Sequence, residues 1–393
     1  MSNLNLVDSI RFADDKNRAT KPRRFKYVNV PFVIAAALVV CYGLVVVYSA
    51  TLNNSDYNFS RQFMFVVIGA VFMFALFHFD YRQLSHYMVA LVAISTLLTL
   101  LPHFPVIGMS ANGATSWIHV GGFSFQPGEL AKVTVILSSA SCVARYGGKL
   151  NDLNEYIKCI AIMLIPCIGI LTQPDMGTCM VYLFIDAVAL IIGGANKKFI
   201  LGTIALLAAA IVGLFVLDPI VDSIVGHDTL LKDYQRARLL VFMDNSYDPD
   251  GDGYNLQQAK IAIGSGGLFG KGYLQATQST LGYLPESATD FIFCVLAEEF
   301  GFVGAMLLLV LYGLLIMRAF NIAKYANDLF GTIVVMCIAG MWIFQILENI
   351  GMDIGLMPIT GIPLPFVSYG SSFMVVNFIL LGFIGSVWAH NGR

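Results

Sequence analysis

Long apolar runs separated by short polar stretches dominate this chain. Each run approaches the roughly 20 apolar residues that a membrane-spanning helix needs. Ten such runs predict ten spans, at 29–50, 62–79, 85–102, 128–144, 156–172, 178–195, 198–217, 291–317, 329–350 and 373–389. The pattern predicts an all-α polytopic membrane protein, with a basic tail over 1–28 and a single ten-helix domain over 29–390.

Basic residues follow a second pattern, because they gather in alternate connections. Seven Lys or Arg precede the first span, and others follow the second, fourth, sixth and eighth spans (Arg82, Arg145, Lys149, Lys197, Lys198, Arg318 and Lys324). Cytoplasmic connections carry such an excess of Lys and Arg. We therefore expect both termini to be cytoplasmic, in a multi-pass protein of the cell membrane.

The connections on the other side are longer and richer in motifs. They cover 103–127, 173–177, a long extracytoplasmic loop at about 218–290 between the seventh and eighth helices, and 351–372. We expect the function on this outer face. The two halves of the chain show no convincing internal repeat, which disfavours a transporter built from repeats.

Composition supports a membrane protein and excludes several other classes. The chain is 57% hydrophobic and only 12% charged, whereas soluble domains are about 25% charged. No basic face or known motif indicates nucleic acid as a partner. The seven cysteines and six histidines show no metal-ligand spacing, so we predict neither a metal site nor a disulfide framework.

Asp290 begins the eighth apolar run, at its outer edge. A carboxylate in a partly dehydrated pocket has a raised pKa and suits a general base. The alternative is a helix cap, because Thr289 or Asp290 before an apolar helix is an ordinary start signal. Glu298 and Glu299 lie deeper in the same run, where an ionisable group is expensive. We expect Glu298 to have a buried polar partner.

Two pairs of polar residues share a helix face by their spacing. Glu129 and Lys132 are three residues apart on the fourth span. They form a self-neutralising pair, or they leave Lys132 available to an anionic substrate or to Asp290. Gln345 and Asn349, four apart on the ninth span, bind sugar hydroxyls or merely bridge helices.

The long loop adds basic groups close to the membrane, among them Arg238 and Lys271. The glycines of "IAIGSGGLFGKG" would let backbone amides approach an anion, with a re-entrant turn as the alternative. Asp175 in "QPDMGT" is expected at a turn and helix cap.

Taken together, the outward segments resemble the SEDS family (shape, elongation, division and sporulation), of the RodA/FtsW type. The resemblance rests on eight motifs in the family's order: "GATSWI", "QPGELAK", "QPDMGT", "YQRAR", "GYNLQQAKIAIGSGGLFGKG", "TQSTLGYLPESATDFIF", "AEEFGFVG" and "GLMPITGIPLPFVSYGSS". It covers nearly the whole chain from the first helix. The short N-terminal tail and the stretch "DPDGDGYNLQQAKIAIGSGGLFGKG" are more similar to RodA than to FtsW.

The resemblance implies a ten-helix enzyme that polymerises lipid II outside the cytoplasmic membrane. The family's essential acid corresponds to Asp290, and its other motif residues correspond to Glu129, Lys132 and Arg238. Family members work with a class B penicillin-binding protein, a transpeptidase. Lipid II and the glycan linked to undecaprenyl pyrophosphate are the implied substrates.

The chain departs from the family pattern at Ser287–Ala288, Ser116, Gly128 and Ser371. The acid and its neighbours remain. With Asp290 as the catalytic residue, we predict these substrate-binding residues: Glu129, Lys132, Arg238, Lys271, Glu286, Thr289, Gln345 and Asn349.

The function predicted on this basis is a peptidoglycan glycosyltransferase for cell elongation and shape. Asp290 would take the acceptor proton, and cationic side chains would neutralise the pyrophosphate. No organic cofactor is expected, although a divalent cation, Mg²⁺ or Mn²⁺, fits the same role. Two alternatives stay open: a flippase for lipid-linked precursors, and a non-catalytic scaffold of the elongation or division complex.

Overall fold

A computed structural model describes most of the chain. The described residues are 28–52, 57–104, 108–111, 114–120, 123–173, 175–225, 233–244, 248, 251 and 253–391. The predicted cytoplasmic tail lies outside them, except for its last residue. The described residues are mainly helical, as the apolar runs predict.

Ten long helices follow the ten predicted runs within this described part. Their bounds are α2 Val30–Leu52, α3 Phe59–His78, α4 Met88–Leu100, α5 Pro127–Ala144, α6 Leu153–Leu171, α7 Met176–Ile192, α8 Lys197–Val225, α12 Ile292–Lys324, α13 Leu329–Asp353 and α14 Ser371–Ala389. Six of them (α2, α3, α6, α12, α13 and α14) are long and apolar enough to cross a membrane. The chain is thus a multi-pass membrane protein, and ten crossings remain a prediction.

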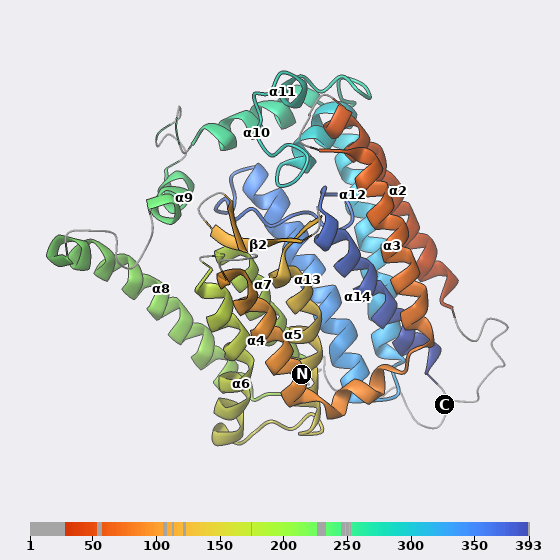
Figure 1. The fold of residues 1–393 in the computed structure, drawn as a ribbon, viewed down its shortest axis with the longest axis vertical. Helices are drawn as coiled ribbons and strands as arrows, with labels where there is room; N and C mark the ends of the chain where they lie inside the picture. The colour runs from red at the N-terminus through yellow and green to blue at the C-terminus, as the bar shows by residue number, and fades with distance from the viewer. Residues whose placement is uncertain are drawn as a thin grey trace, which may run out of the picture.

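Burial separates a central group of helices from the outer ones. Helices α13 and α14 are buried over most of their length, whereas α3 presents most of its surface outward. A helix that is apolar all round suits either environment, protein core or lipid. Helix α8 leans away from the rest of the bundle (Figure 1).

The connections at one end of the bundle carry extra secondary structure. We call this the loop end; it holds β1–β3, α10 and α11 (Figure 1). The strands β1 Gly108–Ala111, β2 Ala114–Val120 and β3 Phe123–Phe125 form an antiparallel sheet in the order β1-β2-β3. Ile118 pairs with both Gly108 and Phe125 and is fully buried. The all-α prediction did not include this sheet.

More than half of the described residues in the predicted loop at 218–290 are helical. Helix α8 continues to Val225, beyond the predicted end of the seventh span, and α9 Asp233–Met243, α10 Tyr254–Gly266 and α11 Thr277–Thr280 follow. Helices α10 and α11 lie across the loop end (Figure 1).

Helix α12 is broken at Gly301, where the sequence predicts one continuous span. Gly301 has φ +64° and ψ −163°, which a residue with a side chain rarely adopts. The segment after α10 packs into the break: the amides of Lys271 and Gly272 donate to the carbonyls of Glu298 and Glu299, at 2.9 and 3.0 Å. The amide of Phe302 donates in turn to Gly267, at 2.9 Å. The hypothesis that this glycine segment presents its amides to an anion is therefore wrong for Lys271 and Gly272.

Candidate functional site

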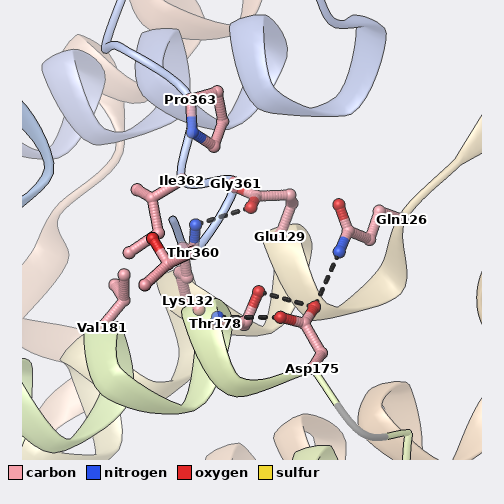
Figure 2. Close-up of a pocket in the computed structure, with 11 residues that line it drawn as sticks. Gln126, Glu129, Lys132, Asp175, Thr178, Val181, Thr360, Gly361, Ile362 and Pro363 are labelled. Atoms are coloured by element: carbon pink, nitrogen blue, oxygen red, sulfur yellow. Dashed lines mark hydrogen bonds and ion pairs between the residues drawn. The ribbon is translucent and has the colours of Figure 1, made fainter. Parts of the chain in front are cut away.

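A polar pocket opens at the loop end, between the first turns of α5 and α7 and the connection from α13 to α14. It encloses about 290 Å³ of empty space, part of it open to solvent. Its lining residues are Gln126, Glu129, Lys132, Asp175, Gly177, Thr178, Val181, Thr360, Gly361, Ile362 and Pro363 (Figure 2). Three segments distant in the sequence therefore contribute to one site.

Glu129 and Lys132 form an ion pair in the wall of this pocket. Lys132 Nζ lies 2.6 Å from Glu129 Oε1, and the two residues are only 1% and 3% exposed. Pro127 begins α5 and Glu129 lies in the first turn of this helix. The pair faces the pocket (Figure 2). Glu129 Oε2 is buried, with no hydrogen-bond partner among the described residues. The predicted pairing is confirmed, and it leaves an acceptor atom facing a polar site.

Asp175 caps α7, as the sequence predicts, and also lines the pocket. Its Oδ1 accepts from the Thr178 amide at 2.9 Å, and its Oδ2 accepts from the Thr178 hydroxyl at 2.8 Å. Gln126 Nε2 donates to Oδ2 at 3.0 Å (Figure 2). These bonds join the starts of α5 and α7, which stiffens one wall of the pocket.

Asp290 lies behind the opposite wall. A Cβ atom added to Gly361 would stand 3.0 Å from Asp290 Oδ2, so the carboxylate reaches the backbone of a lining residue. The helix-cap alternative is wrong, because the cap position of α12 is Phe291, without a side-chain cap bond. Asp290 instead ends a turn in which Glu286 has φ +53°.

The surroundings of Asp290 favour its protonated form. Burial raises the pKa of Asp290 to about 7, and the negative charge of Glu286 adds to the rise. Arg238 and Thr289 lower it. The residue as a whole keeps some accessible surface, so the carboxylate is densely surrounded without being sealed from solvent. A carboxylate with a pKa near 7 can both take and release a proton at neutral pH.

Three more predicted site residues lie around Asp290. Thr289 donates to Glu286 Oε2 at 2.9 Å, and Tyr57 donates to the same oxygen at 2.6 Å. Arg238 Nη1 donates to the Thr360 carbonyl at 3.4 Å. Glu286, Thr289 and Arg238 therefore belong to the neighbourhood of Asp290, as predicted from the sequence; their roles toward a substrate remain predictions.

Lys271 is committed to a different contact. Its ammonium lies 2.5 Å from Glu298 Oε1 and 2.8 Å from the Thr277 hydroxyl. Glu298 Oε1 also accepts from the Thr277 amide at 3.0 Å. Glu298 thus has the polar partner that we expected, but that partner, Lys271, is an exposed residue rather than a buried one. Lys271 therefore lies at the break in α12 and not in the pocket. The buried carboxylate of Glu298 requires a nearby positive charge, and Lys271 supplies it.

The two polar residues predicted on α13 have different surroundings. Asn349 Nδ2 donates to the carbonyls of Asp290 at 2.7 Å and of Ile362 at 2.9 Å, so it bridges the two segments. Gln345 is fully buried, and neither polar atom of its side chain has a partner among the described residues. The bridging alternative is confirmed for Asn349.

Sequence reasoning missed Glu348 and Thr360. Thr360 lines the pocket, and its hydroxyl donates to Glu348 Oε1. Glu348 stands in the apolar segment "WIFQILENIG", and an acid inside a predicted span is itself a signal of function. Nothing in the sequence marks Thr360.

Comparisons with known proteins agree on one family. The family model described as "Cell cycle protein" (FtsW/RodA/SpoVE) matches residues 29–392. The chain is 35% identical to stage V sporulation protein E of Bacillus subtilis, covering 90% of this chain and 95% of that one. It is also 35% identical to the peptidoglycan glycosyltransferase MrdB of Escherichia coli K12, covering 96% and 97%.

Solved structures give the same result. A chain from a structure titled "Structural coordination of polymerization and crosslinking by a peptidoglycan synthase complex" matches with a TM-score of 0.77 and 29% identity. The match covers 93% of this chain and 99% of that one. The rod shape determining protein RodA of Thermus thermophilus matches with a TM-score of 0.67 and 29% identity, covering 93% and 98%.

Proposed function

Since the chain belongs to the FtsW/RodA/SpoVE family, we propose that it is a peptidoglycan glycosyltransferase that polymerises lipid II. The observation that carries this proposal is the placement of Asp290 against Gly361, at the wall of a pocket that holds Glu129 and Lys132. Lys132 thus lines a polar cavity, and the proposed base lies behind the opposite wall of that cavity. Transfer of a glycan from a pyrophosphate carrier needs both.

In this proposal Asp290 is the general base. It takes the proton from the acceptor hydroxyl of lipid II while that oxygen attacks the anomeric carbon of the growing strand. The bond from that carbon to the pyrophosphate breaks at the same time, so the configuration inverts and gives a β-1,4 link. Asp290 then releases its proton to solvent, which its pKa of about 7 permits.

The leaving pyrophosphate requires positive charge. Lys132 and Arg238 are the candidates, because both lie at the pocket or its wall, whereas Lys271 is paired with Glu298. A divalent cation fits as well: Glu129 Oε2, buried with no partner among the described residues, would hold it. Mg²⁺ is usually bound by one or two carboxylates together with substrate phosphates. Bound there, it would neutralise the pyrophosphate, and chelation by EDTA should then lower the rate.

The decisive experiment is incubation of the purified protein with lipid II in detergent. Glycan polymer formed without any other enzyme supports the glycosyltransferase and excludes both the scaffold and the flippase as the sole function. No polymer under conditions in which a known polymerase works would contradict the proposal.

The cellular setting follows from the same proposal. We place the loop end outside the cytoplasmic membrane and both termini inside, because basic residues gather in the connections at the opposite end. A class B penicillin-binding transpeptidase is the proposed partner, supported by the similarity to a chain of a peptidoglycan synthase complex. We assign the chain to cell elongation, so that depletion should give rounded cells rather than filaments.

The polymerisation rate should rise with pH through a midpoint near 7. Asp290 must be ionised to accept a proton, and its pKa is raised to about 7. Replacing Glu286 with Gln removes a negative charge that raises this pKa, so the midpoint should move to lower pH. Initial rates measured between about pH 5 and 9 test this. An unmoved midpoint in Glu286→Gln would contradict the assignment of the titrating group.

Gly361→Ala should reduce the polymerisation rate about 10–100-fold without unfolding the protein. The added Cβ would stand 3.0 Å from Asp290 Oδ2, at a backbone φ of +74° that side chains rarely adopt. The carboxylate or the loop must therefore move. Gly202→Ala in α8 is the matched control, because nothing lies within 4 Å of its added Cβ. Equal rates for both variants would show that the contact is unimportant.

A further inference from the structure

Glu348 is a buried acid that the mechanism above does not use. It lies near the end of α13 and is 1% exposed. Its Oε1 accepts a hydrogen bond from the Thr360 hydroxyl, while its Oε2 is buried with no hydrogen-bond partner among the described residues. A buried carboxylate that satisfies only half of its bonding capacity is costly. Such a cost indicates a role beyond packing.

The next residue on α13 holds the other end of the same short segment. Asn349 Nδ2 donates to the Ile362 carbonyl at 2.9 Å and to the Asp290 carbonyl at 2.7 Å. Glu348 and Asn349 thus form hydrogen bonds with Thr360 and Ile362, the two neighbours of Gly361. Gly361 is the residue whose backbone faces Asp290 Oδ2. One turn of α13 therefore sets how closely the segment 360–362 approaches the proposed base.

Glu348 also shares its electrostatic surroundings with Asp290. The positive charge of Arg238 interacts with both carboxylates. Arg238 also donates a hydrogen bond to the carbonyl of Thr360, the residue whose hydroxyl bonds to Glu348. Asp290 also interacts electrostatically with Tyr57, Glu286 and Asp353. Two acids and one arginine thus surround the segment 360–362.

We propose that Glu348 is a positioning residue of the Asp290 site, which holds the segment Thr360–Ile362 against the base. This inference rests on the proposed polymerase function. It gives Glu348 one testable effect, the hydrogen bond with Thr360 that places the segment.

Two substitutions test this hydrogen bond. Glu348→Gln keeps an acceptor for Thr360, so the turnover rate and the midpoint of the pH–rate profile for polymer formation from lipid II should stay near the wild-type values. Thr360→Val removes the hydrogen bond. Its turnover rate should fall about tenfold at every pH, because the segment is no longer held in place.

A matched control is Glu155→Gln, the same change of charge in the first turn of α6 at the opposite end of the bundle, where Glu155 pairs with Lys158. It should leave the profile unchanged. A wild-type rate in Thr360→Val, or a tenfold lower rate in a folded Glu348→Gln, would overturn the inference. Should Glu348→Gln fail to fold, as judged by size-exclusion chromatography, Thr360→Val alone decides. Absence of polymer from the wild-type protein would overturn the proposed function and this inference with it.

Discussion

Asp290→Asn should lower the rate of glycan polymer formation by about 10²–10⁴-fold, the usual contribution of a positioned general base. Asparagine keeps the size and one oxygen of the side chain, but it cannot accept the proton of the acceptor hydroxyl. The bond from Asn349 to the Asp290 carbonyl involves the backbone and survives the change. Initial rates with purified protein and lipid II measure the effect.

Stability measurements exclude unfolding as the cause. Because the pKa of Asp290 in the folded protein, about 7, exceeds the usual value near 3.9, folding binds a proton. Its contribution to stability is present at low pH and is lost as pH rises through 7. Asp290→Asn removes this dependence, so the variant should melt at or above the wild-type temperature at pH 8.

The matched control for this variant is Asp152→Asn. Asp152 caps α6, where it accepts from the amides of Asn154 and Glu155, and asparagine caps a helix about as well as aspartate. The control should polymerise lipid II at the wild-type rate. A purified Asp290→Asn variant with normal polymer yield would refute the role of Asp290.

The helices were predictable because the membrane imposes one strong rule on the chain. Backbone groups in lipid must bond within their own segment, so each apolar run of sufficient length becomes a helix whatever its neighbours do. The break at Gly301 escaped prediction because its amides and carbonyls bond to 267–272 instead, a long-range contact. The small sheet escaped for a related reason: its strands are short, and each depends on pairing with another segment.

The site was predictable where the chemistry is local. Glu129 and Lys132 meet because three residues separate them on one helix. The charge of Lys271 was equally visible, but its partner Glu298 lies 27 residues away, and only the fold decides between that carboxylate and a substrate. The approach of Gly361 to Asp290 is likewise invisible in the sequence, since 71 positions separate them. Local spacing thus predicts the Glu129–Lys132 pair. The approach of Gly361 to Asp290 depends on tertiary contacts, which the sequence does not show.

Lys132→Met should destabilise the protein by about 3–5 kcal/mol, the usual cost of removing one partner of a buried ion pair. Methionine preserves the apolar stem of the side chain but loses the ammonium, which lies 5.7 Å from the centre of the Phe373 ring. The Glu129 carboxylate is then left buried, with neither oxygen paired. A lower melting temperature in detergent measures the loss.

The double variant Glu129→Gln/Lys132→Met separates stability from function. Without either charge, no unpaired ion remains, so much of the lost stability should return. Polymer formation should stay low, because the proposed cation for the pyrophosphate is still missing. Recovery of both properties would show that the pair only balances charge within the helix.

Lys158→Met supplies the matched control for the single variant. Glu155 and Lys158 have the same order and the same spacing in α6, with Nζ and Oε1 2.8 Å apart, but their side chains are 37% and 65% exposed. Solvent screens such a pair, so its loss should leave the melting temperature and the polymerisation rate near those of the wild-type protein. Since both pairs share one geometry, a large effect confined to Lys132→Met would identify burial in the pocket, rather than the ion pair as such, as the source of the energy.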